Sequence, residues 1–573
     1  MWALHPSRPV RFAALGLGSL LLAVACGNNN NGGSSTAEAP ADQQVLRVNQ
    51  GVEANSLDPS QQTYTYEAAV DRRVFEALLL PKADLSDVQG GAAKSYDVSS
   101  DGLTYTFHLR DNGKWSDGKP VTAKDFVYAW KRMLNPALAA GYAQPFFTGT
   151  VAGGQDYNNI DIKDAAAIDK YLNALGLSAP DDKTFVVKLQ APAGYFKWVA
   201  SLWVGSPVRQ DVVEAAAGGA FPSSDPTKAE MWANDFKTVI GNGAFKISEQ
   251  VAKDHITLAP TSTYWGTAAK LQKIIYYYIS DTNTAFAKYR TGDLDVYSAS
   301  TTNVDVIRND PVLKKQATLY KGLSTTWFTF NATKSPLSNP NVRLALAKSI
   351  DRNQLANNVL HGIVAPAQTF IPQGMPGFDG SDTAQKFDPT AAKKLLSDAG
   401  VTAAQLSGFK ILTRDATRNK TVNEFISNQW QTNLGVNIAV DVVDSKTVTS
   451  RIRKGQFDIY GEDGWIADYP DQQDWADIFV TGSCRNLNWG CPPLDGYDKL
   501  VGQADGGTSQ TERLRLYSQA QKQLIDQAAV AFLEQGAEYD VVKPYVKGLS
   551  VTPMDDQGTP GDLFYNNVFI AKH

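Results

Sequence analysis

The segment EDGWIADYPDQQDWADIF, residues 462–479, concentrates side chains that can do chemistry. It holds six carboxylates and four large aromatic rings: Glu462, Asp463, Asp468, Asp471, Asp474 and Asp477, with Trp465, Tyr469, Trp475 and Phe479. Two adjacent carboxylates can serve as the acid and base of a hydrolase, several can bind Ca²⁺, and one among aromatic rings can receive a cationic ligand. A solvated helix face has the same composition.

The secondary structure expected around these acids places them in different settings: a strand end, a loop and a short helix. Residues 457–465 are predicted to form a strand, and Tyr469-Pro470 ends any regular structure because proline disfavours helix in the residue before it. Three apolar residues at helical spacing then predict a short helix: Trp475, Ile478 and Phe479. Three acids are expected on the solvated side of that helix: Asp471, Asp474 and Asp477. Asp468 lies in the loop between strand and helix, where α/β proteins place ligands.

Linear motifs of catalysis are absent from the sequence. It contains no G-x-S-x-G, H-E-x-x-H or G-x-x-x-x-G-K-[ST] pattern, and its five histidines are far apart. A carboxylate-pair hydrolase has no linear signature and stays an alternative. We therefore expect no catalytic residue, no metal site and no cofactor.

Length and charge limit the remaining possibilities. A chain of 573 residues exceeds the size of a single hydrophobic core, so two or three lobes are expected. Its net charge of −5 gives no sign of the positively charged surface that nucleic-acid binding usually needs, so we expect no nucleic-acid partner. Predicted strands and helices alternate along most of the chain, which indicates an α/β or mixed class.

The first 41 residues are predicted to lie outside the fold. Arg8 and Arg11 precede an apolar stretch, residues 12–25, that is shorter than the roughly 20 residues of a membrane-spanning helix. This pattern predicts a signal peptide over residues 1–25. The end of the stretch, LLAVAC, resembles a bacterial lipobox, which implies cleavage before Cys26 and lipid on that cysteine. Simple cleavage after Ala25 with a free thiol is the alternative, and residues 26–41 have the composition of a flexible tether.

The two remaining cysteines lie close together in the sequence. Cys484 and Cys491 can pair in an oxidising compartment, or they can remain free thiols. A metal site is disfavoured because no histidine lies near them and two ligands are too few.

Local patterns predict several elements. Leu103, Tyr105, Phe107 and Leu109 alternate with polar residues, as in a half-buried strand. A capping box over residues 122–125 starts a helix. Its core face is predicted to consist of Phe126, Ala129, Trp130, Met133 and Leu134. Further helices are expected over 67–80, 281–290, 340–360, 388–399 and 419–434, and strands over 45–50, 271–279, 293–299 and 436–444. Residues 240–247 are expected to form a glycine-containing turn that leads into a strand.

Residues 101–136, DGLTYTFHLRDNGKWSDGKPVTAKDFVYAWKRMLNP, resemble the signature of the peptide-binding proteins of ABC importers. The matching positions are Arg110, Asp111, Trp115, Ser116, Asp117, Gly118, Pro120, Thr122, Ala123, Asp125 and Phe126. Further similar segments follow in the family's order: 56–59, 242–246, 263–266, 339–352, 387–400 and 464–471. The resemblance covers residues 45–573 and is closest to the oligopeptide-binding lipoproteins, extracellular solute-binding protein family 5.

The resemblance implies a two-lobed α/β periplasmic-binding-protein fold with two crossovers and an extra inserted subdomain (class II, cluster C type). Lobe I is then expected to comprise 42–65, 203–322 and 544–573, with the inserted subdomain at 66–202. Lobe II is expected to comprise 323–543. In this family the ligand lies between lobes that close by a hinge.

The resemblance also implies the site residues. The family's aspartate at the position of Asp468 binds the α-ammonium of a peptide, whereas an ordinary loop cap is the alternative role for it. The peptide backbone would be bound by two segments: Gly464, Trp465 and Ile466, and Glu53, Ala54 and Asn55. Arg453 matches a basic position near the ligand's carboxylate end, and Tyr142 would come from the inserted subdomain. Glu462 departs from the family, since oligopeptide binders can carry a basic residue there.

The expected role is that of a receptor without enzymatic activity. Through the resemblance we expect a monomer anchored by lipid on Cys26 at the outer face of the cytoplasmic membrane, in the periplasm or at the cell surface. It would bind oligopeptides and deliver them to an ABC permease. The alternatives are another cargo on the same fold, such as an oligosaccharide or a nickel chelate, or a secreted carboxylate hydrolase.

Overall fold

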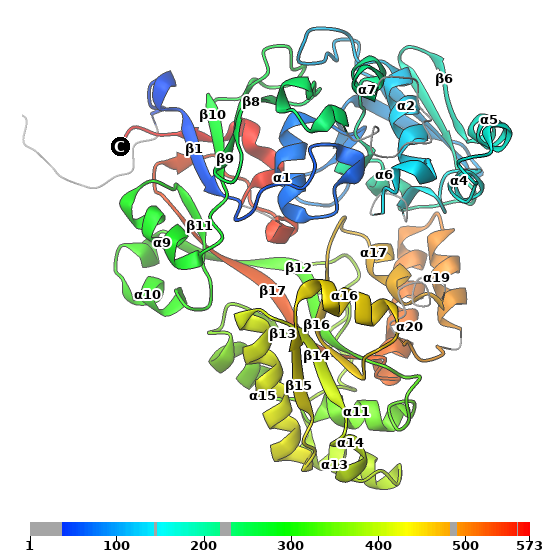
Figure 1. Ribbon diagram of the computed structural model, residues 1–573, viewed down its shortest axis with the longest axis vertical. Coiled ribbons are helices and arrows are strands. Elements are labelled where there is room, and N and C mark those ends of the chain that lie inside the picture. The colour runs from blue at the N-terminus through cyan, green and yellow to red at the C-terminus, as the bar shows by residue number, and fades with distance from the viewer. Residues whose placement is uncertain (1–36, 142–145, 218–230, 482–489, 495, 558–559) are drawn as a thin grey trace, which may run out of the picture.

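A computed structural model of the chain describes residues 37–141, 146–217, 231–481, 490–494, 496–557 and 560–573. Figure 1 shows an upper and a lower body joined by two long strands, β12 (Ala317–Phe330) and β17 (Val530–Val542). The predicted two-lobed α/β fold with two crossovers is therefore confirmed. Among the described residues, no helix combines the length and the apolar character needed to cross a membrane.

The upper body contains a four-stranded sheet built from both ends of the chain. Its strands, in spatial order, are β1 (Val45–Asn49), β10 (Lys273–Tyr277), β9 (His255–Pro260) and β8 (Phe245–Val251). Strand β1 runs parallel to β10, and its Leu46 and Val48 are fully buried. The C-terminal hairpin of β18 (Val546–Lys547) and β19 (Phe569–Ile570) lies beside β1, where the Ile570 backbone N–H donates to Gln44 Oε1 at 2.8 Å.

A second sheet of the upper body carries the segment that resembles the peptide binders. Its strands, in spatial order, are β4 (Ala93–Val98), β5 (Thr104–Leu109), β7 (Thr184–Lys188) and β6 (Leu177–Asp181). Helix α2 (Ala123–Leu134) packs on this sheet and begins with the predicted capping box, in which the Thr122 N–H donates to Asp125 Oδ2 at 2.8 Å. The predicted inward-facing residues of β5 and α2 are buried, because their side chains fill the space between sheet and helix.

The two sheets of the upper body share one apolar core. A single cluster of buried side chains includes Leu46 and Ile274 from the first sheet and Phe107 and Trp130 from the second sheet and its helix. The hairpin of β2 (Leu79–Pro81) and β3 (Val88–Gly90) also belongs to this body. Its described helices are α1 (Thr65–Val74), α4 (Gly154–Asn158), α5 (Ala165–Ala174), α6 (Phe196–Val199), α7 (Gln210–Ala217), α9 (Thr282–Thr291) and α10 (Val304–Asn309). The limits expected for the inserted subdomain, 66–202, remain a prediction.

The lower body is built on a mixed sheet that both crossovers enter. Its spatial order is β11 (Val296–Ser298), β17, β12, β16 (Ile459–Ile466), β14 (Lys410–Arg414) and β15 (Ala439–Val443), with β13 (Ala365–Pro366) on β17. Helices on its faces include α11 (Pro340–Lys348), α12 (Arg352–Gln354), α13 (Pro389–Asp398), α14 (Ala403–Leu406), α15 (Thr417–Leu434), α16 (Ser445–Arg453), α17 (Gln473–Ala476), α19 (Tyr497–Asp505) and α20 (Gln510–Asp526). The ladder between β12 and β17 shifts register between Lys321 and Thr325, where Gln535 Nε2 donates to the Gly322 carbonyl at 2.9 Å.

Two predicted helices are wrong in length. The helix expected over 67–80 ends at Val74, because Asn242 accepts from the Glu76 N–H at 2.9 Å and donates to its carbonyl at 3.0 Å. The helix expected over 340–360 ends at Lys348. Asp351 then caps a new turn by accepting from the N–H groups of residues 353 and 354 at 3.0 and 3.1 Å. The predicted helices near 281–290, 388–399 and 419–434 are confirmed.

A buried ion pair joins the loop after β1 to helix α2. Asp58 and Arg132 each have fully buried side chains. Arg132 Nη1 donates to Asp58 Oδ1 at 3.1 Å, and Nη2 donates to Oδ2. Asp58 also accepts from the Ser60 N–H at 3.1 Å and from Trp232 Nε1 at 3.3 Å, so both carboxylate oxygens have more than one donor. The pair therefore connects residues 56–59 with residues 101–136, two segments that each resemble the peptide-binding family.

Candidate functional site between the two lobes

Strand β16 brings the acidic–aromatic segment to the contact between the lobes. It pairs antiparallel with the crossover strand β12, with Trp465 opposite Thr325 and Gly464 opposite Thr326. One residue past the strand, the Ala467 N–H donates to the Leu323 carbonyl at 2.8 Å. The backbone is therefore held by the sheet up to the residue before Asp468.

Asp468 lies in the wall of a cavity between the bodies. The side chain is buried, with the residue 6% exposed, and it lines a cavity of about 380 Å³. The upper body contributes aromatic, basic and amide side chains to this lining, among them Arg72, Arg73, Trp203, Tyr264, Trp265, Phe564 and Asn566. Met554 and Leu563 also line the cavity and pack against a core cluster of the lower body. The loop carboxylate of the lower body thus faces a pocket of the upper body, the kind of interdomain position where ligand sites occur.

The expectation that Asp471 and Asp474 face solvent is wrong. Asp471 is 1% and Asp474 3% exposed, whereas Asp477 is half-buried. Helices α19 and α20 cover this side of α17, and Tyr497 on α19 donates to the Ala476 carbonyl at 2.8 Å. Apolar spacing correctly placed one face of the short helix, but it gave no sign that distant helices cover the opposite face.

Asp471 has a specific partner in the covering helix α20. Arg513 donates from Nη1 and Nη2 to the two oxygens of Asp471, both at 2.8 Å. Both side chains are almost fully buried, at 2% and 1% exposure. This two-point ion pair fixes the loop directly after Tyr469-Pro470 and compensates one of its acids.

Asp474 contacts two residues of the predicted ligand site. Its Oδ2 accepts from the Asp468 N–H at 2.8 Å, and its Oδ1 accepts from Trp465 Nε1 at 3.2 Å. Burial raises the pKa of Asp474 well above its usual value, and the nearby charge of Asp468 raises it further. Sequence reasoning missed this residue, because nothing in its spacing from Asp468 predicts that the chain turns back on itself.

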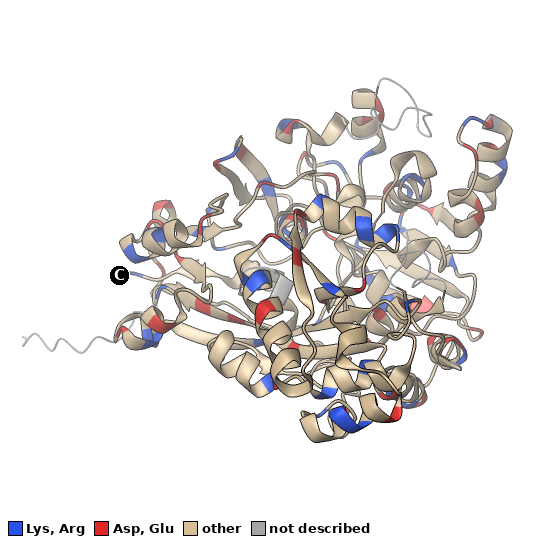
Figure 2. Cartoon of the chain, turned by 60° about the horizontal axis from the view of Figure 1, so that its bottom comes forward, with Lys and Arg blue, Asp and Glu red and all other residues tan. Residues whose placement is uncertain are grey.

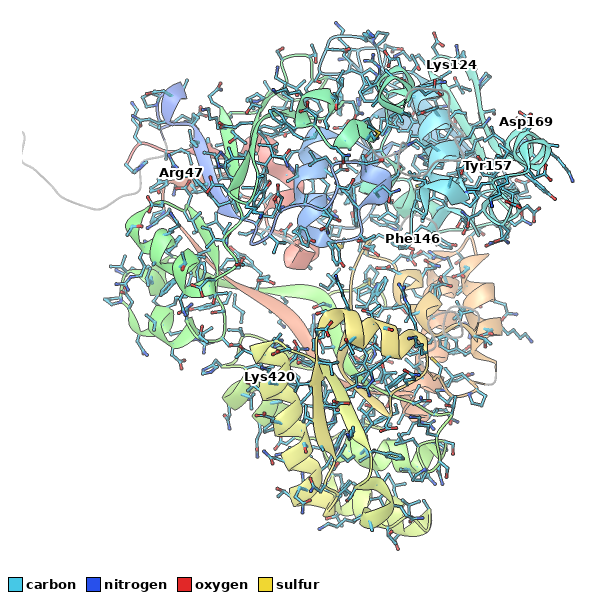
Figure 3. All side chains as sticks on the ribbon, viewed as in Figure 1. Arg47, Lys124, Phe146, Tyr157, Asp169 and Lys420 are labelled. Carbon is cyan, nitrogen blue, oxygen red and sulfur yellow. The ribbon has the colours of Figure 1, made fainter. Side chains whose placement is uncertain are left out.

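The two bodies also touch beside this loop. The ring of Tyr469 meets the ring of Phe146 edge-on, with centroids 6.0 Å apart. Figure 3 shows Phe146 at the lower rim of the upper body, toward the lower body. The Gly194 N–H of the upper body donates to the Asp505 carbonyl at 3.2 Å. The loop that carries Asp468 is therefore flanked by direct contacts between the lobes.

Glu462 is already paired within the protein. It stands at a bulge between β16 and β12, with a left-handed backbone φ of 56°. Its side chain is 4% exposed, and Oε1 lies 3.3 Å from Arg418 Nε of helix α15. Arg418 also pairs with Glu534 on the crossover strand β17. Burial raises the pKa of Glu462 to about 7, although the positive charge of Arg418 opposes the rise.

The remaining predicted site residues lie in several places. Glu53, Ala54 and Asn55 are in the loop after β1, which Glu67 organises by accepting from the Asn55 N–H at 2.9 Å. Arg453 ends helix α16 and is exposed. Tyr142, Cys26 and Cys484 lie outside the described residues. Cys491 is disulfide-bonded, and its pairing with Cys484 stays a prediction, as do the ligand-binding roles of the others.

Glu76 is a second buried carboxylate in the wall of the cavity. Its oxygens accept from Tyr264 Oη and Trp265 Nε1, both at 2.5 Å, and the guanidinium of Arg110 stacks 3.4 Å from the centroid of the Trp265 ring. Burial raises the pKa of Glu76 to about 7, while these hydrogen bonds and the Arg110 charge act in the opposite direction. The native state therefore binds this proton more tightly than the unfolded chain does.

We predict that Glu76→Gln flattens the pH dependence of stability. Because the folded pKa lies above the unfolded one, Glu76 makes the free energy of unfolding fall as pH rises from about 4.5 to about 7, by on the order of 3 kcal/mol. Urea unfolding at a series of pH values measures the difference between variant and wild type. Glu512→Gln, at an exposed position, is the matched control. Parallel pH profiles for wild type and Glu76→Gln would contradict the prediction.

Asp468 lies in an enclosed wall beside aromatic rings and close to a second acid, a setting in which a carboxylate can pair with a cationic group. Two basic side chains, Arg72 and Arg73, line the same cavity. Among the described residues, no group of three or more His, Cys, Asp or Glu side chains is arranged to hold a metal ion. Charges elsewhere are mixed, as Figure 2 shows Lys and Arg interspersed with Asp and Glu over the face it draws.

Comparison with known proteins identifies the family. The model described as bacterial extracellular solute-binding proteins, family 5 Middle, matches residues 87–486. The periplasmic oligopeptide-binding protein OppA of Salmonella typhimurium is 31% identical over 551 residues, covering 93% of this chain and 94% of that protein. The structure of Haemophilus influenzae OppA in complex with RPPGFSPFR is 27% identical with a TM-score of 0.74, covering 92% of this chain and 99% of that one. The substrate-binding domain of an oligopeptide ABC transporter from Bacillus anthracis is 26% identical with a TM-score of 0.72, covering 94% and 100%. The chain therefore belongs to family 5 of the bacterial extracellular solute-binding proteins.

Proposed function

We propose that this protein is an extracytoplasmic receptor that binds oligopeptides between its two lobes and delivers them to an ABC permease. The observation that carries the proposal is the position of Asp468, a buried carboxylate of the lower body in the wall of the interlobe cavity. Full-length similarity to proteins named for oligopeptide binding supports the cargo, and the Bacillus anthracis relative supports the transporter.

In this proposal Asp468 binds the α-ammonium group of the peptide. An enclosed ammonium is costly without a partner, so one fixed carboxylate selects ligands with a free amino terminus. Main-chain groups of Gly464–Ile466 and Glu53–Asn55 would pair with the peptide backbone, which gives affinity that depends little on side-chain sequence. Trp465 would line the site, and Arg453 and Tyr142 would contact the ligand further along.

Lobe closure would occur at the crossovers. The register break between Lys321 and Thr325 interrupts the ladder of β12 and β17 where the strands pass between the bodies. Hinges in binding proteins are a few residues that absorb the change in backbone angles. We assign this role to residues 322–324 and the facing part of β17.

The receptor is proposed to act as a monomer, without catalysis, at the outer face of the cytoplasmic membrane. The support is the signal-like stretch at 12–25, the lipobox-like LLAVAC and the polar composition of residues 27–36. The last residues of the expected tether at 26–41 instead join the fold, since Ala39 is buried and its N–H donates to the Ile570 carbonyl at 2.8 Å. Lipid on Cys26 would then keep the folded body close to the permease.

Native mass spectrometry of the protein as purified tests the proposed cargo. We expect a ladder of bound masses that fragment into peptides of several sequences, because backbone recognition tolerates different side chains. A single bound sugar mass, or a nickel complex, would contradict the peptide assignment while leaving the family intact. Turnover of a peptide by pure protein would contradict the receptor role.

A further inference from the structure

A loop of the upper body rests on a turn of the lower body, away from the crossovers. Residues 192–195 lead into α6, and residues 504–507 form the turn at the end of α19. The Gly194 N–H donates to the Asp505 carbonyl at 3.2 Å. In Figure 1, α19 lies on the right of the lower body beneath α6, whereas β12 and β17 enter from the left. The bodies are therefore linked through the chain on one side and touch through backbone on the other.

The approach of the two bodies leaves no room for a side chain on Gly194. A Cβ at this position would lie 2.7 Å from the Gly507 carbonyl oxygen, 3.1 Å from Arg513 Cδ and 3.2 Å from Arg513 Nε. All three atoms belong to the lower body. The backbone of Gly194 is not left-handed, so its own conformation would accept alanine. Glycine is therefore required here by the contact between the bodies rather than by the fold of the upper body.

Each side of the contact is fixed to its own body. In the upper body, Tyr105 Oη of β5 donates to the Ala193 carbonyl at 3.1 Å. In the lower body, Arg513 Nε of α20 donates to the Ala504 carbonyl at 3.0 Å. The loop and the turn thus meet as two supported backbone segments. When the bodies move apart, the contact between Gly194 and Asp505 has to break.

Arg513 connects this contact to the loop that carries Asp468. The same guanidinium that supports Ala504 also donates from Nη1 and Nη2 to the two oxygens of Asp471, both at 2.8 Å. Asp471 follows Asp468 in the same loop. One buried side chain therefore holds both the turn that meets the upper body and the loop at the interlobe cavity.

We propose that loop 192–195 and turn 504–507 form a latch that holds the lobes closed over a bound peptide, and that Gly194 is the residue that lets the latch engage. The inference rests on the proposed function and deepens it. A peptide enters while the lobes are apart, so entry does not use the latch. The latch engages on closure, and it stabilises only the closed state. Apparent affinity follows the population of the state that holds the ligand. Loss of the latch is therefore expected to speed peptide release and to leave association unchanged.

Stopped-flow tryptophan fluorescence measures the two rates separately. Trialanine and tetra-alanine serve as probes after copurified peptide has been removed. Gly194→Ala is expected to raise the dissociation rate by about tenfold, because the added methyl separates the two backbones and weakens their hydrogen bond. Gly194→Val, with a larger side chain, is expected to raise it further. The association rate should change less than about twofold in both variants, since it reports entry into the open protein.

Gly502→Ala is the matched control, because a Cβ at this position in α19 has no atom within 4 Å. It should keep both wild-type rates. Urea unfolding of the peptide-free proteins should give the same stability for Gly194→Ala and the wild type.

Three results would overturn the latch: wild-type dissociation rates in both Gly194 variants, a loss of affinity that lies in the association rate, or a Gly194→Ala protein that does not fold. The last result would mean that Gly194 supports the fold rather than closure. A folded wild type that binds neither peptide contradicts the proposed function instead, so the two failures are distinguishable.

Discussion

Replacing Asp468 with asparagine is expected to weaken the binding of free-amine peptides by about 2–5 kcal/mol, since removing one partner of a desolvated charge pair leaves the other uncompensated. Asparagine keeps the size of the side chain and its place in the loop. The loss therefore reports the charge of Asp468 rather than a change of packing. This is the largest effect on binding that the site predicts.

The measurement pairs two proteins with two ligands. Calorimetry compares wild type and Asp468→Asn, each with a tripeptide and with the same tripeptide N-acetylated. Acetylation removes the ammonium, so the wild type should lose a similar free energy, and the variant should distinguish the two ligands poorly. Asp526→Asn, at an exposed acid paired with Lys522, is the matched control and should bind like the wild type. Equal affinities of the wild type for both ligands would remove the amine-receptor role from Asp468.

Asp58→Ala is expected to lower the free energy of unfolding by about 3–5 kcal/mol, because it leaves the fully buried guanidinium of Arg132 without its counter-charge. The substitution also removes the acceptor of Ser60 and Trp232 and empties a buried space. The affected contacts connect the loop after β1 with helix α2, both in the upper body. Binding at Asp468 is affected only through the fraction of folded protein.

Urea unfolding followed by tryptophan fluorescence measures this loss. Arg132→Met provides a second route to the same result, because it leaves the buried Asp58 uncompensated instead. Lys394→Ala breaks an exposed i,i+4 pair with Asp398 and should cost no more than about 0.5 kcal/mol. If Asp58→Ala cost no more than this control, the pair would not be a main support of the upper body.

The local parts of the fold were predictable from the sequence. The capping box at Thr122 and Asp125, the alternation of β5 and the apolar face of α2 depend on neighbours within a few residues, and the structure confirms them. The family resemblance added the lobes and the crossovers, which no local pattern contains. Asp468 could be predicted because the family resemblance of residues 464–471 and its place in the loop between strand and helix both indicated a ligand site. The structure places it at the interlobe cavity.

The missed features depend on partners far away in the chain. Asp471 and Asp474 looked solvent-facing because α19 and α20, which cover them, follow later in the sequence. Glu462 looked like an isolated departure because Arg418, its partner, belongs to another helix. The helix at 67–80 was overestimated because Asn242 replaces the helical hydrogen bonds of Glu76. In each case a tertiary contact overrode a sound local expectation.

The single apolar core beneath the two upper sheets has a consequence for folding cooperativity. Side chains from the first sheet, from β5 and from α2 belong to one continuous cluster, whereas the lower body has separate clusters of its own. Two elements that share a core cannot unfold independently without exposing it. The two upper sheets are therefore expected to melt as one unit although they look like separate modules, and a fragment cut to contain only the second sheet would lose the surface on which it is stabilised.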